Sequence, residues 1–153
     1  MKVCTIGFKG RSAREFFEAL KTAGVAKVID VRRNNSSQLA GYTKGRDLEF
    51  FLVECFGIAY EHVPELAPSA ELLGEYRKQL GKKKKDDDAW AHFVEVFTRE
   101  IGEKPTVDTF SQSANGFASV CLLCSESTAE RCHRRLLAEH IGDKGEDIEI
   151  EHL

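Results

Sequence analysis

The sequence contains little proline and no long hydrophobic run. Only three prolines occur in 153 residues. The start, MKVCTIGFKG, breaks into glycine and charge after a short apolar run, unlike a signal peptide. No stretch approaches the roughly 20 apolar residues that a membrane-crossing helix needs. We therefore expect neither a targeting segment nor a membrane partner.

An excess of charge of one sign is also missing. The chain has 22 lysines and arginines against 25 acidic residues, a formal net charge of -3. Global electrostatics therefore offer no attraction to nucleic acid, so such binding would need a local patch. The run KKKK at 82–85 is followed by DDD, which favours a solvated turn over a patch. A nucleic-acid-associated or interaction module stays open as an alternative function.

The cysteine count excludes complete pairing into disulfides. Five cysteines form an odd set. Without a secretion signal, an odd set is typical of free thiols in a reducing cytoplasm.

At this length, we expect one compact domain over residues 1–153. The sequence says nothing about the oligomeric state.

Apolar runs and helical stripes alternate along the chain. Runs typical of strands lie at 2–6, 25–31, 58–63, 118–124 and 148–153, the last with the alternation of an edge strand. Helices are expected near 13–20, 48–56, 72–80, 90–101, 105–114 and 127–141. Capping boxes at Ser12–Glu15 and Ser127–Glu130 would open the first and last of these helices. This order predicts an α/β layered sandwich with a mostly parallel central sheet of about five strands flanked by helices.

Ligands of parallel sheets bind outside the carboxyl ends of the strands. That rule points to the residues after Gly7, Asp30, His62 and Cys124. Gly7-x-x-Gly10 precedes a helix and could cradle a phosphate group. The segment 34–45 has loop composition and is expected to be mobile or to face a ligand.

The cysteine-rich stretch 121–140 has the spacing of a zinc site. Cys121-x-x-Cys124 and the pair Cys132-His133 would supply four ligands. Residues three apart on a strand point to opposite faces, however, so Cys121 and Cys124 cannot both bind one ion without a break in the strand. We therefore expect no metal site and no cofactor, and keep a zinc-binding protein as a second alternative.

Cys124 is the candidate nucleophile. A thiol between a strand end and a helix N-terminus has a lowered pKa because of the helix dipole and the free N–H groups. Cysteine phosphatases and rhodaneses use such a strand–loop–helix, but here the loop lacks glycine and Glu126 would repel an oxyanion. The candidate catalytic residues are Cys124, with Glu126 or His133 to move a proton. The alternative is a packed or hydrogen-bonded thiol.

An acid at the end of an apolar strand needs a partner. Asp30 is followed by Arg32, and Arg134 and His133 are the other candidates. The pair either ties two loops together or orients a ligand-binding group. We expect a polar pocket at the carboxyl edge of the sheet that binds or acts on a small anionic or nucleotide-like molecule, with ligand-binding candidates Gly7, Asp30, Arg32, Cys132 and Arg134.

Four motifs resemble one family. They are T-I-G-(x)4-S-x-x-E-F near the start, D-V-R, H-V-P-E-L, and L-L-C-S-E-(x)5-C-H-R-x-L-L-A. Together they resemble the family catalogued as domain of unknown function 488, over nearly the whole chain. The resemblance implies a small α/β protein and implies no particular reaction. It groups as motif positions Gly7, Asp30, Arg32, Pro64, Glu65, Leu66, Cys124, Glu126, Cys132, His133 and Arg134.

Overall fold

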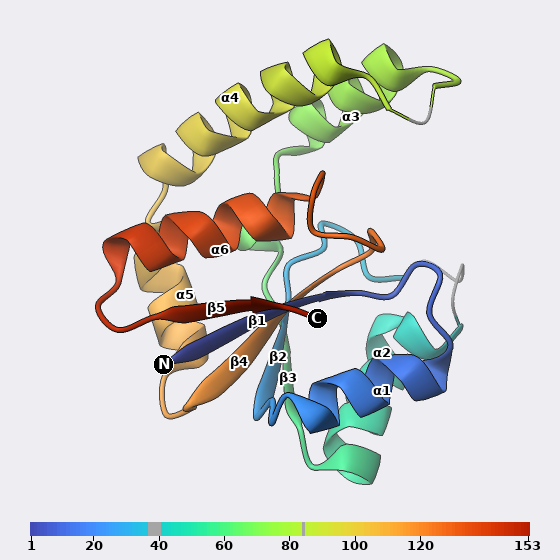
Figure 1. Cartoon of the computed structure of the whole chain (residues 1–153), viewed down its shortest axis with the longest axis vertical. Helices are drawn as coiled ribbons and strands as arrows, with labels where there is room; N and C mark the ends of the chain where they lie inside the picture. The colour runs from blue at the N-terminus through green and yellow to red at the C-terminus, as the bar shows by residue number, and fades with distance from the viewer. Residues whose placement is uncertain (37–40, 84) are drawn as a thin grey trace.

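One sheet of five parallel strands organises the molecule (Figure 1). The computed structural model describes residues 1–36, 41–83 and 85–153. The strands are paired in the order β3-β2-β4-β1-β5. Their bounds are β1 (Lys2–Gly7), β2 (Lys27–Asp30), β3 (Ala59–His62), β4 (Ser119–Cys124) and β5 (Glu149–His152). The predicted α/β fold is confirmed, and every strand pair is parallel.

Helices connect the strands largely where the apolar stripes predict them. Their bounds are α1 (Ala13–Thr22), α2 (Gly45–Phe50), α3 (Ala70–Leu80), α4 (Asp87–Glu103), α5 (Thr106–Ala114) and α6 (His133–Lys144). A π-helical segment, η2 (Phe51–Cys55), continues α2, and short 3₁₀ turns cover η1 (Gly41–Thr43) and η3 (Pro64–Leu66). The capping box between Ser12 and Glu15 is formed at α1. Helix α4 runs past Gly102, its expected end, to Glu103.

The second capping box is not formed, so the prediction of a helix from Ser127 was wrong. Helix α6 begins only at His133, with Cys132 as an N-cap that makes no side-chain hydrogen bond. Glu130 instead lies 4.0 Å from Lys85. Residues 125–131 form bends and turns that carry the chain from the end of β4 to the start of α6. The Cys132-His133 pair therefore lies at the very start of the helix.

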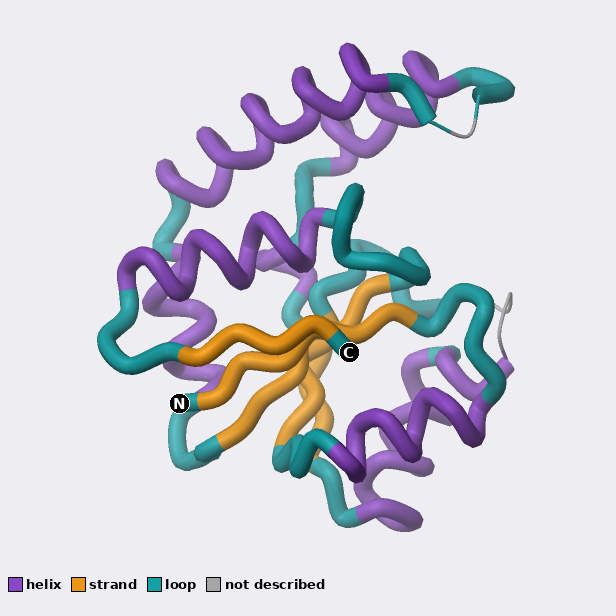
Figure 2. The backbone as a smooth tube through the Cα atoms, in the orientation of Figure 1, coloured by secondary structure: helices purple, strands orange, loops and turns teal. Residues whose placement is uncertain are grey.

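The two faces of the sheet carry separate cores, since successive strand residues point to opposite sides. Cys4, Val28, Cys121 and Leu123 pack with residues of α1, α2 and η2. Val3, Ile29, Val120 and Leu122 pack on the other face with residues of α4, α5 and α6. Figure 2 shows helices on both sides of the strands. Helix α6 packs on β4 and β1, α4 packs on α6, and α3 packs on α4 (Figure 1).

The last strand is an edge strand, as its alternation predicts. β5 pairs with β1 alone and keeps most of its side chains exposed. Of the loop expected at 34–45, residues 37–40 lie outside the described residues, and the part after them forms η1 and the start of α2. Within 1–36, 41–83 and 85–153, no helix has both the length and the apolar character that crossing a membrane requires.

Candidate functional site

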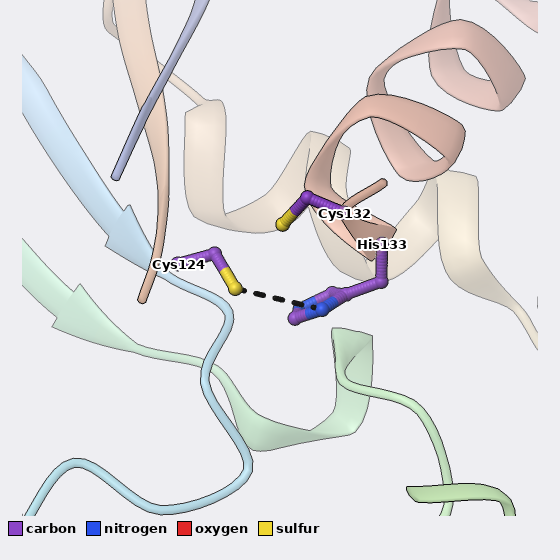
Figure 3. A group of neighbouring side chains, drawn as sticks. All are labelled: Cys124, Cys132 and His133. Atoms are coloured by element: carbon purple, nitrogen blue, oxygen red, sulfur yellow. Dashed lines mark hydrogen bonds between the residues drawn. The ribbon is translucent and has the colours of Figure 1, made fainter. Parts of the chain in front are cut away.

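Two thiols and an imidazole meet at the carboxyl end of β4 (Figure 3). Cys124 is the last residue of β4, Cys132 caps α6, and His133 is its first residue. The two sulfur atoms and a ring nitrogen of His133 lie within 4.8 Å of one another. Cys124 Sγ is 3.5 Å from His133 Nδ1. The structure thus brings together three of the residues that the sequence analysis singled out.

The imidazole of His133 is held from its far side. Its Nε2 lies 3.0 Å from the carbonyl oxygen of Val31, which follows β2. A carbonyl only accepts hydrogen bonds, so Nε2 carries the proton and donates it. Nδ1 is thereby left facing the Cys124 thiol. Phe97 of α4 packs against the ring, edge on, with 5.9 Å between ring centroids.

Charge separation between Cys124 and His133 is favoured. A hydrogen bond from Cys132 is the largest influence on the pKa of Cys124, which lies well below its ordinary value. Burial raises this pKa, but the charge of His133 and the Glu126 backbone N–H lower it further. Burial lowers the pKa of His133, but the Cys124 thiolate outweighs it and the net shift is upward. Its hydrogen bond to Cys124, followed by burial, raises the pKa of Cys132 well above normal. The three directions favour a thiolate at Cys124 beside a protonated His133, with Cys132 keeping its proton.

Arg134 is buried beside this pair. It is 1 % exposed, and its Nη1 donates to the Glu126 carbonyl at 2.6 Å and to Cys132 Sγ at 3.3 Å. The carbonyl lies directly over Gly7, where a Cβ atom would come within 1.6 Å of it. This close approach explains why residue 7 is a glycine, since any larger side chain would overlap the Glu126 carbonyl. The chain itself fills the space in which a phosphate was expected to bind.

The carboxylate of Glu126 is turned away from the thiols. Its side chain is exposed and lies 3.6 Å from the ammonium group of Lys9. Only the backbone of Glu126 faces the site, with its N–H toward Cys124 and its carbonyl toward Arg134. The carboxylate is thus not placed to exchange a proton with Cys124, whereas His133 Nδ1 lies 3.5 Å from the Cys124 sulfur.

Asp30 and Arg32 form a second, separate cluster. Arg32 donates from Nε and Nη2 to the two Asp30 oxygens at 2.7 and 2.6 Å, and both residues are buried. Nη2 also donates to the Thr43 carbonyl at 2.9 Å. Tyr60, which the sequence analysis did not single out, donates its hydroxyl to Asp30 at 2.8 Å. Burial, followed by the Asp30 charge, raises the pKa of Tyr60, so the hydroxyl keeps its proton.

The two clusters lie on opposite faces of the sheet. Asp30 alternates with Ile29 and therefore points to the face of α1 and α2, where Arg32 also contacts the ring of Phe8 at 5.3 Å from its centroid. Cys124 alternates with Leu123 and points under α6. The single polar pocket that was expected to hold both Arg32 and Arg134 is thus not the arrangement seen. A hollow of about 380 Å³ adjoins the Asp30–Arg32 cluster, lined by residues that include Asn35, Lys44, Arg46, Tyr60 and His62.

The three donors at β4 have the chemistry of a soft-metal site. Two thiolates and an imidazole suit zinc, with a fourth position left for another ligand. The hydrogen bond from Nε2 to the Val31 carbonyl is the kind of support that metal-bound histidines have. Cys121 is not part of this group, because it packs in the core on the opposite face, as strand alternation predicts.

Fold and site together define an α/β protein with a cysteine–histidine centre at the carboxyl edge of a parallel sheet. The family model described as "Domain of unknown function DUF488" matches residues 12–141. The chain belongs to this family, as its motifs predict. No curated protein and no solved structure matches the chain.

Proposed function

We propose that the protein is an enzyme that uses Cys124 as a nucleophile and His133 as its base. The observation that supports this most directly is the 3.5 Å contact between Cys124 Sγ and His133 Nδ1, in a ring oriented by the Val31 carbonyl. A nucleophile, a base and a third group that orients the base are the signature of covalent catalysis by thiols. The position at a strand end fits the place where parallel sheets bind ligands.

The substrate class follows from the charges at the site. The Cys124 thiolate and the His133 imidazolium cancel, and the buried Arg134 guanidinium leaves one positive charge in excess. The carboxylate of Glu126 points away and does not compensate it. A small anionic or nucleotide-like substrate is therefore favoured. Cys124 would bond to its electrophilic atom while His133 gives a proton to the leaving group.

Access to the thiols is narrow. Cys124 is 3 % exposed, whereas His133 is only partly buried. A substrate would approach past the imidazole, along the irregular segment 125–131.

We also propose that the protein works in a reducing cytoplasm, because both Cys124 and Cys132 must remain thiols. Both are free in the structure.

The pH dependence of alkylation tests the proposal. Iodoacetamide reacts with thiolates, so the rate at Cys124 should reach half its maximum well below pH 8.5, the ordinary thiol value, and then stay flat. Peptide mass spectrometry of the labelled protein separates Cys124 from the exposed Cys55, which serves as internal control. Burial slows the alkylation of Cys124 by the same factor at every pH, so the pH of the midpoint, and not the rate itself, is the readout.

His133→Gln is the matched variant, since glutamine keeps a polar side chain but cannot hold the positive charge. It should move the Cys124 midpoint upward and slow labelling at pH 6.5 about tenfold or more, one factor of ten for each unit of pKa. A wild-type midpoint equal to that of Cys55, or one that His133→Gln leaves in place, would refute the nucleophile.

A metal centre is the second candidate, favoured by the mutual distances within 4.8 Å among Cys124, Cys132 and His133. The same labelling experiment distinguishes the two. A bound soft metal would protect both thiols together until a chelator is added, and elemental analysis would find about one ion per chain. Labelling that a chelator does not change supports the nucleophile instead.

A further inference from the structure

We propose that this site also reduces hydroperoxides, with Cys132 as the second thiol that closes a disulfide with Cys124. The inference rests on the proposed reactivity of Cys124 and adds a substrate class and a role for Cys132. The two sulfur atoms lie within 4.8 Å of each other. A disulfide needs about 2.05 Å, so a shift of under 3 Å joins them.

The structure around Cys132 allows that shift. Cys132 is the N-cap of α6 and follows the irregular segment 125–131. Its side chain makes no capping hydrogen bond to the helix, so the sulfur atom can move toward Cys124 without breaking one. Cys124, by contrast, is fixed at the end of a central strand. The other cysteines are excluded as partners: Cys4 and Cys121 belong to the core on the opposite sheet face, and Cys55 is exposed on η2.

Arg134 prepares the second thiol for attack. Its Nη1 is 3.3 Å from Cys132 Sγ, and the whole side chain is buried. A buried guanidinium stabilises the negative charge that develops on Cys132 when it loses its proton. The hydrogen bond therefore supports a chemical role for Cys132.

The chemistry balances in two steps. The Cys124 thiolate attacks one oxygen of the hydroperoxide, the O–O bond breaks, and the leaving oxygen takes the His133 proton, which gives a sulfenic acid and water or an alcohol. The Cys132 thiolate then attacks the Cys124 sulfur, and the hydroxyl group leaves as water with the proton from Cys132. Two thiols are oxidised by two electrons and one peroxide is reduced. A small external thiol then regenerates the pair by exchange, since it can reach the buried disulfide.

The burial of both sulfurs selects a small oxidant. Cys124 and Cys132 are 3 % and 2 % exposed. Hydrogen peroxide is close to water in size and suits so closed a site, whereas a large thiol such as a second protein cannot reach the sulfur atoms. We therefore expect the intramolecular disulfide rather than a mixed one.

The test treats the reduced, metal-free protein with one equivalent of hydrogen peroxide and maps its peptides without reduction. The expected product is a Cys124–Cys132 disulfide, two mass units lighter, which dithiothreitol reverses. Oxidation of Cys124 to sulfinic acid in the wild type, or a disulfide to any other cysteine, would overturn the inference.

Cys132→Ser isolates the first step. Serine is a better N-cap than cysteine, so α6 should keep its start and the variant should fold. Its Cys124 should stop at sulfenic acid, which dimedone traps, and no disulfide should form. Cys121→Ser is the matched control and should form the disulfide normally. Rapid alkylation of Cys124 without any disulfide would remove this inference alone, whereas a normal alkylation midpoint would remove the proposed function.

Discussion

At the scale of single residues, Gly7 shows how closely the chain is packed around the site. The Glu126 carbonyl and Arg134 Nη1 both lie against its Cα, where a Cβ atom would be 1.6 and 2.9 Å from them. One of these neighbours is backbone and the other is a buried cation that also contacts Cys132. Neither can move without disturbing the thiols. Gly7 therefore links the end of β1 to the geometry of Cys124.

We predict that Gly7→Ala destabilises the protein by about 2 kcal/mol or more, because the added methyl group overlaps backbone in a filled space. Urea unfolding measures the loss. Gly74→Ala is the control: Gly74 lies inside α3 with open space around it, so alanine should stabilise by up to about 1 kcal/mol. Equal, small effects of both substitutions would show that the space over Gly7 can open.

At the scale of secondary-structure elements, the Asp30–Arg32 pair joins three segments. Asp30 ends β2, Tyr60 belongs to β3, and Arg32 reaches the Thr43 carbonyl in η1. Both charges are inside the protein, at 0 and 5 % exposure. Arg32 Nη1 and Arg134 Nε are buried without a hydrogen-bond partner among the described residues. The Asp30–Arg32 pair is thus sensitive to the loss of either member.

We predict that Asp30→Asn lowers the free energy of unfolding by about 3–5 kcal/mol, since it leaves the buried Arg32 charge without its counter-ion. Thermal or urea unfolding checks this. The exposed pair Arg14–Glu18 is the control, and Glu18→Gln should change stability little. If Asp30→Asn were as harmless as Glu18→Gln, the pair would contribute little to joining these segments.

At the scale of the whole molecule, charge is balanced and locally paired. The net charge is -3, and Lys83 of the basic run contacts Asp86 at 2.8 Å in the turn before α4. Arg131, which precedes Cys132 in the chain, contacts Asp87 of the same acidic run. These pairs leave little free positive charge on that part of the described surface for phosphate backbones.

We predict that the protein does not bind double-stranded DNA or RNA, even at low salt. Phosphate contacts supply most of such binding, and their effect is largest when salt is low. Fluorescence anisotropy of labelled duplexes at about 20 mM salt measures it, with a basic protein as positive control. Binding that weakens steeply as salt is added would contradict the prediction and favour a nucleic-acid-associated role.

Much of the fold could be predicted from the sequence because its signals are local. The strand runs, the Ser12 capping box and the stripes of α3 and α4 are patterns within one segment. The Ser127 capping box failed for the opposite reason. Its residues have the right types, but the chain between β4 and α6 must cross the end of the sheet, and the bond from Arg134 to the Glu126 carbonyl holds the helix start at His133.

The candidate site was predictable in part. Alternation along β4 separated Cys121 from Cys124, and the structure agrees. Alternation along β2 also places Asp30 on the opposite face of its strand from Ile29. That this separates Asp30 from Cys124 follows only once β2 and β4 are known to be neighbours. Tyr60 could have been found as the residue two before His62, on the same face of β3, once β3 was known to be the neighbour of β2.

The sequence by itself determined the α/β fold class, the parallel sheet, the family and the residue types at the site, because periodicity and motifs are written along the chain. Only the tertiary structure decided which of those residues meet. It placed Cys132 and His133 beside Cys124, turned the Glu126 carboxylate away, and put Asp30 and Arg32 on the opposite face. The physical reason is that contacts across a sheet depend on strand order and helix start, which no local pattern encodes.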